Sequence, residues 1–248
     1  MTTRPGAEPF THDAGDVGVL LCHGFTGSPA SLRPWAEHLA DRGHSVRLPL
    51  LPGHGTTWQE MNRTTWEDWY AVVDAAFREL HERCERVVVA GLSMGGALAT
   101  RVAADHGPRV RGLVLVNPAF RVDDVRLRAL PLIKGLLPSL PGIGNDIALA
   151  GQDEVAYDRI PLRALHSQTR LWAEVIKDLP EVTQPVLLFQ SRQDHVVPRS
   201  STDLFLSRVG STDVTEVVLE DSYHVATLDH DAERIVERTD AFVEQVTA

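Results

Sequence analysis

Two patterns of apolar and polar residues alternate along the chain. Short apolar, β-branched runs recur, and several are continuously apolar, which is typical of parallel strands buried on both faces. Between them lie longer stretches with the spacing of amphipathic helices. The expected strands are residues 17–22, 45–48, 86–90, 112–116, 186–190 and 214–219, and the expected helices are residues 30–42, 66–83, 94–106, 199–209 and 232–246.

Strand and helix patterns that alternate in this way predict an α/β fold with a doubly wound, mostly parallel sheet. One interval breaks the alternation: residues 119–183 contain no convincing strand, only an apolar, proline-containing stretch and a helical pattern over residues 162–179. A connection of this length is more often functional than a simple crossover. We therefore expect one domain, residues 1–248, with residues 119–183 inserted as a small cap whose apolar stretch, residues 130–143, lines a pocket.

The segment GLSMGG, residues 91–96, follows directly on the apolar run at 87–90 and precedes a helical pattern. Strand, tight turn and helix are the context in which G-x-S-x-G forms a nucleophile elbow. Glycines relieve crowding at such a turn, and the serine projects above the carboxyl edge of the sheet, where open α/β folds bind ligands. Ser93 is therefore the candidate nucleophile. A glycine turn with an incidental serine is the alternative.

A serine hydroxyl needs a base to take its proton. In the α/β-hydrolase fold, to which the elbow points, an Asp or Glu and then a His follow the serine along the chain. Asp194 comes just after the apolar run 186–190, and His224 comes after the last expected strand. His224 is therefore the candidate base, and Asp194 is the acid that orients it.

Four other residues near these loops are less favoured. His195 is adjacent to Asp194, and we expect its side chain to lie on the wrong side of the loop. His230 is expected to be a solvated surface histidine, and Asp221 a turn residue. Asp123 could supply the acid from the loop of the preceding strand, but it lies several residues beyond the end of that strand.

Acyl transfer through a serine also requires hydrogen-bond donors for the oxyanion. One is expected to be the backbone N–H of Met94, which follows the nucleophile, and the other an N–H of the loop after the first central strand. That loop is HGFTG, residues 23–27, and Phe25 is the candidate. His23 is expected to brace the loop by hydrogen bonds, and His54 to belong to a structural turn between glycines.

Composition limits the range of partners. The 248 residues include 24 Lys and Arg against 34 Asp and Glu, a formal net charge of −10. This charge disfavours binding to nucleic acid and tight docking on an anionic membrane. No signal peptide and no apolar run of membrane-spanning length is visible, so we expect a cytoplasmic protein. Cys22 is expected to be a buried free thiol rather than a partner of Cys84, and no spacing typical of a metal site occurs.

Four segments of the chain carry a family resemblance: HGFTGSPASLRPWAE, LPGHGTTWQEMNRTTWEDW, GLSMGG and DHVVP…DSYHVATLDHD. Together they resemble the bacterial monoacylglycerol lipases and their carboxylesterase relatives. The likeness runs from the first strand to the final helix and is weakest in the expected cap. RTTWEDW and SYHVATLD are its most specific parts.

This resemblance implies hydrolysis of the ester of a monoacylglycerol to a fatty acid and glycerol, without a cofactor. The residues it implies are Ser93, Asp194 and His224 as catalytic triad and Phe25 and Met94 as oxyanion donors. It also implies that Ile143 and Glu154, in PGIGND and DEVAY, lie near the path of the ester. A core isoleucine and a surface glutamate are the alternatives for these two.

Other functions use the same fold. A short-chain carboxylesterase or a thioesterase would use the same triad and is the alternative activity. Epoxide hydrolases and haloalkane dehalogenases of this fold need an Asp at the elbow, where this chain has Ser93. A non-catalytic ligand-binding protein is disfavoured because no member of the candidate triad is missing. The stretch 130–143 could touch a lipid surface, but pocket lining is favoured; the sequence leaves the oligomeric state open.

Overall fold

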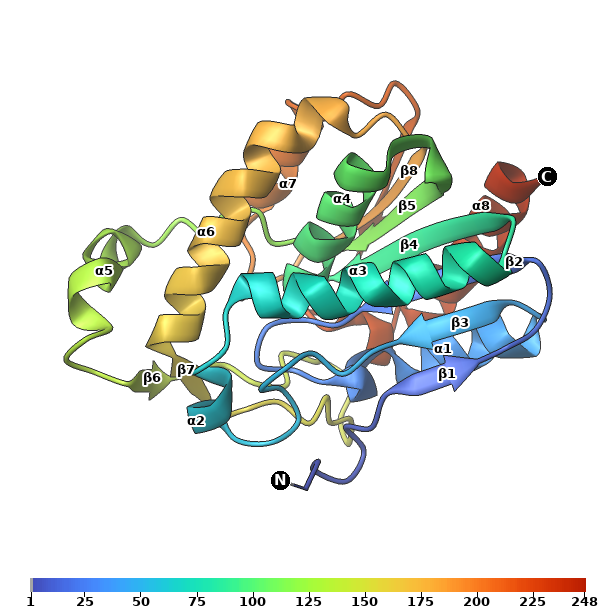
Figure 1. The fold of residues 1–248 in the computed structure, drawn as a ribbon. Helices are drawn as coiled ribbons and strands as arrows, with labels where there is room; N and C mark the ends of the chain where they lie inside the picture. The colour runs from blue at the N-terminus through green and yellow to red at the C-terminus, as the bar shows by residue number, and fades with distance from the viewer. Residues whose placement is uncertain (1) are drawn as a thin grey trace.

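The computed structural model describes residues 2–248. Within that range seven strands form one sheet in the order β1-β3-β2-β4-β5-β8-β9 (Figure 1). The strands are β1 (Phe10–His12), β2 (Val17–Cys22), β3 (Ser45–Leu48), β4 (Arg86–Leu92), β5 (Val110–Val116), β8 (Val186–Ser191) and β9 (Val214–Leu219). β1 pairs antiparallel with β3, and the other pairs are parallel. The expected mostly parallel sheet is confirmed.

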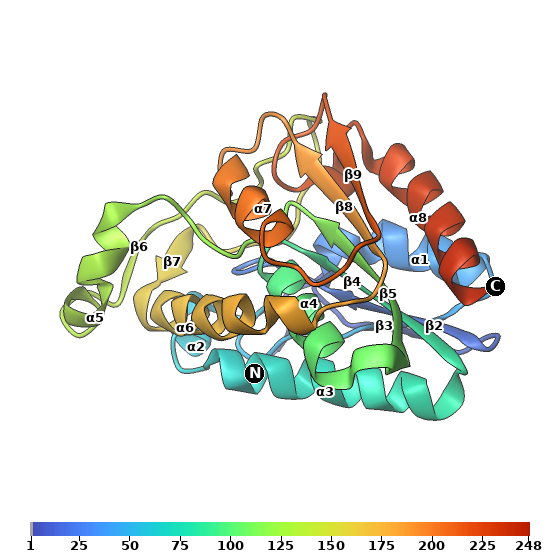
Figure 2. The ribbon, with the colours of Figure 1, turned by 90° about the horizontal axis from the view of Figure 1, so that it is seen from above.

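Helices cover both faces of this sheet. They are α1 (Arg33–Asp41), α2 (Trp58–Met61), α3 (Trp66–Arg83), α4 (Met94–His106), α5 (Leu130–Ile133), α6 (Leu162–Asp178), α7 (Arg199–Leu206) and α8 (Ala232–Thr247). Figure 2 shows α1 and α8 on one face and α3, α4 and α6 on the other. Each layer encloses its own apolar core, because successive residues of a strand point to opposite faces: Leu20 packs with Trp69 on one side, and Leu21 packs with Trp35 on the other.

The expected strands and helices are all present, with ends shifted by a few residues. The expected helix at 30–42 is divided into a 3-10 turn (Pro29–Leu32) and α1. Pro34 explains this division, since it has no backbone N–H to continue the helical hydrogen bonds. The sequence pattern missed β1 and α2, which have three and four residues and are too short to show a hydrophobic period.

The segment between β5 and β8 is more structured than expected. It contains α5, α6 and a small antiparallel sheet of β6 (Ser139–Pro141) and β7 (Arg159–Pro161), so the expectation of no strand there was wrong. Each of these strands has three residues, which is too few for a visible alternation. α6 packs against α3 and α4, whereas α5, β6 and β7 project beyond the main sheet (Figure 1).

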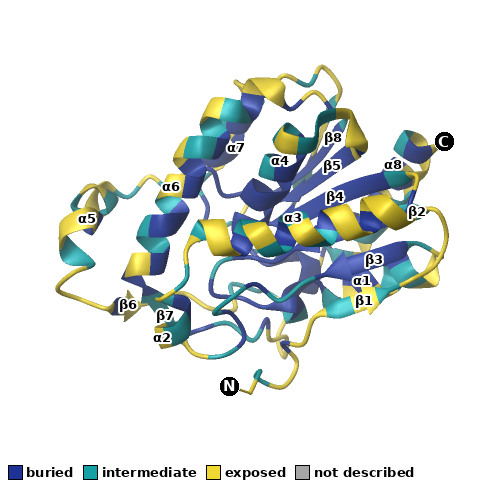
Figure 3. Cartoon of the chain, in the orientation of Figure 1, coloured by how far each residue is buried: buried dark blue, intermediate teal, exposed yellow. Residues whose placement is uncertain are grey.

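The apolar stretch 130–143 is mostly exposed, which corrects the expectation that it lines a pocket. Leu132 is 80% and Leu136 86% exposed, and Figure 3 shows α5 largely in the colours of accessible residues. Of this stretch, Ile143 lines the cavity that contains Ser93.

Two smaller expectations agree with the structure. Cys22 and Cys84 are both buried, and both are free thiols. Every helix of residues 2–248 is too short or too polar to cross a lipid bilayer.

Candidate active site

Ser93 lies on a tight turn between β4 and α4. Its φ of 57° and ψ of −120° are rare for a residue with a side chain. The glycines around it leave no room for a side chain: a Cβ atom at Gly91 would lie 2.2 Å from the Gly95 carbonyl oxygen, and one at Gly95 would lie 1.9 Å from the Cys22 carbonyl oxygen. The Ser93 N–H donates to the carbonyl of Val116 at 3.0 Å. The predicted elbow is therefore present, with its serine in a strained conformation.

Asp194 and His224 lie at the carboxyl ends of β8 and β9, which are neighbouring parallel strands. The His224 Nδ1–H donates to Asp194 Oδ2 at 2.8 Å, and the two side chains are 8% and 2% exposed. The other Asp194 oxygen, Oδ1, accepts from the N–H groups of Val196 and Val197 at 2.8 and 2.7 Å. This carboxylate is thus fixed on both sides, and the Nε2 of His224 is left as the nitrogen that can accept a proton.

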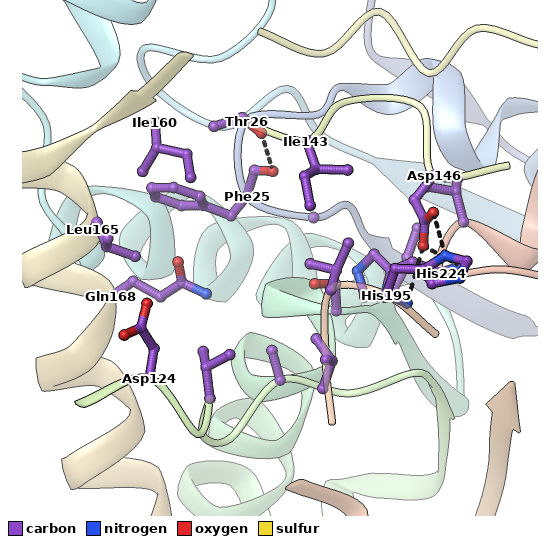
Figure 4. A pocket seen from close by; sticks show the side chains of 18 of the residues that line it. Phe25, Thr26, Asp124, Ile143, Asp146, Ile160, Leu165, Gln168, His195 and His224 are labelled. Atoms are coloured by element: carbon purple, nitrogen blue, oxygen red, sulfur yellow. Dashed lines mark hydrogen bonds and ion pairs between the residues drawn. The ribbon is translucent and has the colours of Figure 1, made fainter. Parts of the chain in front are cut away.

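Ser93 and His224 line the same cavity, which has a volume of about 350 Å³ (Figure 4). Among residues 2–248 no hydrogen bond joins the Ser93 hydroxyl to His224. Such contacts commonly tighten only when a substrate is bound. The structure therefore brings together the three residues that the sequence selected, in the chain order of the α/β hydrolases.

The pKa of His224 is set by opposing effects. Burial of the ring lowers its pKa, whereas the charge and hydrogen bond of Asp194, and then the charges of Glu154 and Asp146, raise it. The net shift is upward, so the imidazolium form is stabilised in this site. A base of this kind becomes a stronger proton acceptor and also holds the proton well once it has taken it.

The loop after β2 passes beside the elbow. A Cβ atom at Gly24 would lie 3.9 Å from the Ser93 Oγ, and the next residue, Phe25, lines the cavity. Met94 is the first residue of α4, so its N–H has no acceptor within the helix. Both expected oxyanion donors therefore belong to segments that border Ser93.

His23 braces this loop, as expected. It is fully buried; its Nδ1–H donates to the Gly24 carbonyl at 3.0 Å, and its Nε2 accepts from the Leu51 N–H at 3.2 Å. Burial lowers the pKa of His23 to about 4, so the ring is neutral around pH 7. His54 packs edge-on against His23 and Trp69 in the neighbouring turn, which agrees with the structural role expected for it.

The less favoured candidates have other partners. Asp123 is exposed and binds Arg121 and Ser200, and both His230 and Asp221 are exposed. The expectation for His195 was wrong, because this residue does line the cavity. Its side chain is 53% exposed, and its Nδ1–H donates to Asp146 Oδ1 at 2.8 Å. The next two residues, Val196 and Val197, also line the cavity.

Glu154 and Ile143 both line the cavity. The alternatives considered for them, a surface glutamate and a core isoleucine, have their burial the wrong way round. Glu154 is buried, at 9% exposure, and Ile143 is 64% exposed. The Glu154 Oε1 accepts from the Asn145 N–H at 3.0 Å. Its Oε2 lies 3.0 Å from where a Cβ atom at Gly27 would be. Burial raises the pKa of this carboxyl group.

Asp146 connects both triad loops, which no pattern in the sequence indicates. Its Oδ2 accepts from the backbone N–H of His224 at 3.1 Å and of His195 at 3.3 Å. Its own carbonyl accepts from the Val225 N–H at 3.1 Å. A lone Asp in an irregular segment carries no periodicity or motif, so only the three-dimensional arrangement identifies it.

Asn117, at the end of β5, is a second residue that the sequence analysis missed. It is fully buried, with a φ of 44°. Its Nδ2 donates to the His224 carbonyl at 2.7 Å and to Ser191 Oγ at 2.9 Å, and its Oδ1 accepts from the Ser191 N–H at 2.7 Å. A polar residue directly after the apolar run of a central strand was the signal available for it.

Comparison with known proteins shows the family. The pattern of the serine aminopeptidase S33 hydrolases matches residues 16–231, most of the chain. The chain belongs to this family. Its relatives include the bacterial monoacylglycerol lipases and carboxylesterases that the four sequence segments resemble, so that resemblance is confirmed.

Two curated members of the family align along nearly the whole chain. A thermostable monoacylglycerol lipase of Bacillus sp. strain H-257 is 44% identical over 235 residues, 94% of this chain and 93% of that protein. A carboxylesterase of Bacillus subtilis strain 168 is 25% identical over 240 residues, 96% of this chain and 97% of that protein.

Solved structures confirm the expected α/β-hydrolase fold. One that belongs to the metagenome-derived lipolytic enzymes LipS and LipT has a TM-score of 0.95 and 44% identity, and covers 98% of this chain and 100% of that chain. The monoglyceride lipase of Saccharomyces cerevisiae, at 14% identity, has a TM-score of 0.80 over 96% of this chain and 90% of that chain. At that identity the second likeness concerns the fold alone.

Proposed function

We propose that this protein is a serine ester hydrolase that cleaves monoacylglycerols, and simple carboxylic esters as well, to a fatty acid and an alcohol. The observation that carries the proposal is the strained Ser93 in one cavity with His224, whose imidazole is hydrogen-bonded to the buried Asp194. The 44% identical relative named a monoacylglycerol lipase supports the substrate class. The relative named a carboxylesterase supports the wider range of esters.

In the proposed mechanism the Ser93 Oγ attacks the ester carbonyl while His224 Nε2 takes its proton. Asp194 stabilises the imidazolium that forms, and the N–H groups of Phe25 and Met94 stabilise the oxyanion. His224 then protonates the departing alcohol, which leaves an acyl group on Ser93. A water molecule activated by His224 releases the fatty acid by the same steps in the second half of the reaction. Apart from the ester and this water molecule, residues of the chain supply every group that these steps use.

The two ends of the cavity suggest how the ester is oriented. Figure 4 shows Phe25, Ile160 and Leu165 at one end, away from His224. These apolar side chains suit a hydrocarbon chain. Ile143 and the buried carboxyl group of Glu154 also line the cavity, and we assign them to the alcohol side of the ester. The acyl end would then lie against α6, and glycerol near Glu154.

We further propose that residues 119–183 function as a cap. More than half of the residues that line the cavity belong to this segment. The exposed side chains of Leu132 and Leu136 on its outer side are suited to transient contact with a lipid aggregate, from which a poorly soluble ester would be taken. The site of action we propose is the cytoplasm.

The test is to compare kcat/KM on monoacylglycerols, diacylglycerols and p-nitrophenyl esters across acyl chain lengths. We expect turnover of monoacylglycerols and p-nitrophenyl esters and poor turnover of diacylglycerols. Ser93→Ala should lower kcat by about 10⁶-fold with an unchanged circular dichroism spectrum. Turnover retained in this variant would disprove the nucleophile. A clear preference for short simple esters over monoacylglycerols would make the protein a general carboxylesterase.

A further inference from the structure

The apolar end of the active-site cavity contains a polar side chain that the proposed mechanism does not use. Gln168, on α6, is 4% exposed and lines the cavity. Figure 4 shows its amide reaching into the cavity near Leu165 and Asp124, at the end away from His224. Among residues 2–248 this amide makes no hydrogen bond.

Each of the other buried amide side chains of residues 2–248 makes at least one hydrogen bond, although the Gln184 Oε1 is buried without a partner. The Gln184 Nε2 donates to the carbonyls of Ala103 and Gly107 at 2.9 and 2.7 Å. The Gln190 amide donates to the Ser191 carbonyl and accepts from Thr202. Most buried polar groups in proteins are satisfied in this way. Among the buried amides of residues 2–248, Gln168 differs in that its amide makes no hydrogen bond and faces the cavity, so a molecule that enters the cavity can supply its partner.

The neighbours of Gln168 do not supply that partner. Asp124, at the same end in Figure 4, already accepts hydrogen bonds from the backbone N–H and the guanidinium of Arg126. Trp172 lies one helical turn further along α6 and also lines the cavity, and its own indole N–H is buried without a partner. Residues four apart share a face of a helix. Gln168 thus brings an unpartnered amide to the end of the cavity that Phe25, Ile160 and Leu165 also line.

A plain hydrocarbon chain would be a poor occupant of this position. Water can satisfy the amide while the cavity is empty of ligand, but an alkyl chain would displace that water and offer no hydrogen bond in return. A hydroxyl or keto oxygen on the chain would accept from the Gln168 Nε2, and a hydroxyl would also donate to its Oε1. Sites that bind a substrate hydroxyl discriminate strongly against analogues that lack it.

We propose that Gln168 is a specificity-determining residue that binds an oxygen carried on the acyl chain, so that the preferred substrates are esters of hydroxy- or oxo-acids. This inference rests on the proposed ester hydrolase function and names its substrate class more closely. The bound oxygen lies part-way along the acyl chain. The number of carbons between it and the ester carbonyl is set by the distance from Gln168 to Ser93.

The experiment compares wild type with Gln168→Leu, which keeps the size of the side chain and removes its polar atoms. The substrates are p-nitrophenyl esters of equal chain length, unsubstituted or with one hydroxyl at successive positions. In the wild type we expect a maximum of kcat/KM for one hydroxyl position or two adjacent ones. In Gln168→Leu that preference should fall by about tenfold or more, and kcat/KM for the plain ester should rise, because the alkyl chain no longer displaces water from an amide.

Gln245→Leu is the matched control, because Gln245 is exposed on α8, and it should keep the wild-type profile. Equal ratios of hydroxylated to plain ester in wild type and Gln168→Leu, at every position, would overturn the inference. Turnover of plain esters in that same result would leave the ester hydrolase proposal intact.

A binding measurement tests the role of Gln168 independently of ester hydrolysis. The free hydroxy-acid and the plain acid are titrated calorimetrically into Ser93→Ala, with and without Gln168→Leu, so that no turnover is needed. Tighter binding of the hydroxy-acid, lost in the double variant, supports the role of Gln168 even if no ester were hydrolysed. Equal binding of both acids contradicts it.

Discussion

The carboxyl edge of the main sheet and the segment 119–183 around it are built in different ways. At the edge, Asp194 and His224 are 2% and 8% exposed, and short loops from adjacent parallel strands fix them. In the outer part of the segment, Leu132 and Leu136 are 80% and 86% exposed, on the four-residue helix α5 and in the turn that follows it. The edge is suited to hold reacting groups at fixed positions. The segment around it is suited to contact variable substrates.

The two regions meet along one strip of chain. Asp146 binds the loops of His195 and His224. Asp229 accepts from the N–H groups of Ala148 and Leu149 at 2.7 and 2.9 Å, and also from that of Tyr223. The inner strip of residues 119–183 is therefore joined to the histidine loop by two carboxylates. Its outer part has no such attachment, so the two halves of this segment should respond differently to substitution.

The largest effect should come from the edge itself. Asp194→Asn keeps the shape of the side chain but loses the charge that orients His224, and we expect kcat to fall by about 10⁴-fold. The measurement is kcat on a p-nitrophenyl ester, with thermal unfolding followed alongside. Asp123→Asn is the control and should keep wild-type activity, because the partners of Asp123 among residues 2–248 are Arg121 and Ser200, which lie outside the triad. The reverse result would make Asp123 the orienting acid.

A smaller effect should come from the strip that joins the two regions. Asp146→Ala removes hydrogen bonds to both triad loops, so His224 should be positioned less accurately. We expect kcat to fall by about 10- to 100-fold, the cost of misplacing a catalytic group by about 1 Å, with less change in KM. Asp158→Ala, at an exposed position of the same segment, should change neither. If Asp146→Ala and Asp158→Ala behave alike, the proposed difference between the inner strip and the outer part of residues 119–183 is wrong.

The same two regions differ in how well the sequence predicts them. Ser93, Asp194 and His224 could be located because each follows an apolar strand, and parallel strands bring their carboxyl ends to one edge. The contact of Asp146 with those loops could not be predicted, because an irregular segment has no hydrophobic periodicity from which its path can be inferred. The resemblance predicted that Ile143 and Glu154 lie at the cavity, but it did not predict which of the two side chains is buried. The exposed Leu132 and Leu136 were misjudged, since an apolar run does not show whether its neighbours cover it.

The smallest predicted effect is a change in pH dependence. Only neutral His224 can act as a base, so activity should rise as the pH passes through its pKa. Burial lowers this pKa, but the charges of Asp194, Glu154 and Asp146 outweigh burial. The rise should therefore lie above the usual histidine value of about 6.5.

Glu154→Gln removes one of those charges and keeps an oxygen to accept from the Asn145 N–H. The pKa of His224 should then decrease, and the rise of kcat/KM should move to lower pH. The measurement is the pH profile of kcat/KM on a p-nitrophenyl ester, with Asp158→Asn as an exposed control whose profile should stay in place. Burial also raises the pKa of Glu154 itself, so two groups in one cavity compete for the proton. An unchanged profile in Glu154→Gln would mean that Glu154 is already protonated where His224 titrates, and that this residue supplies shape but no charge to the catalytic edge.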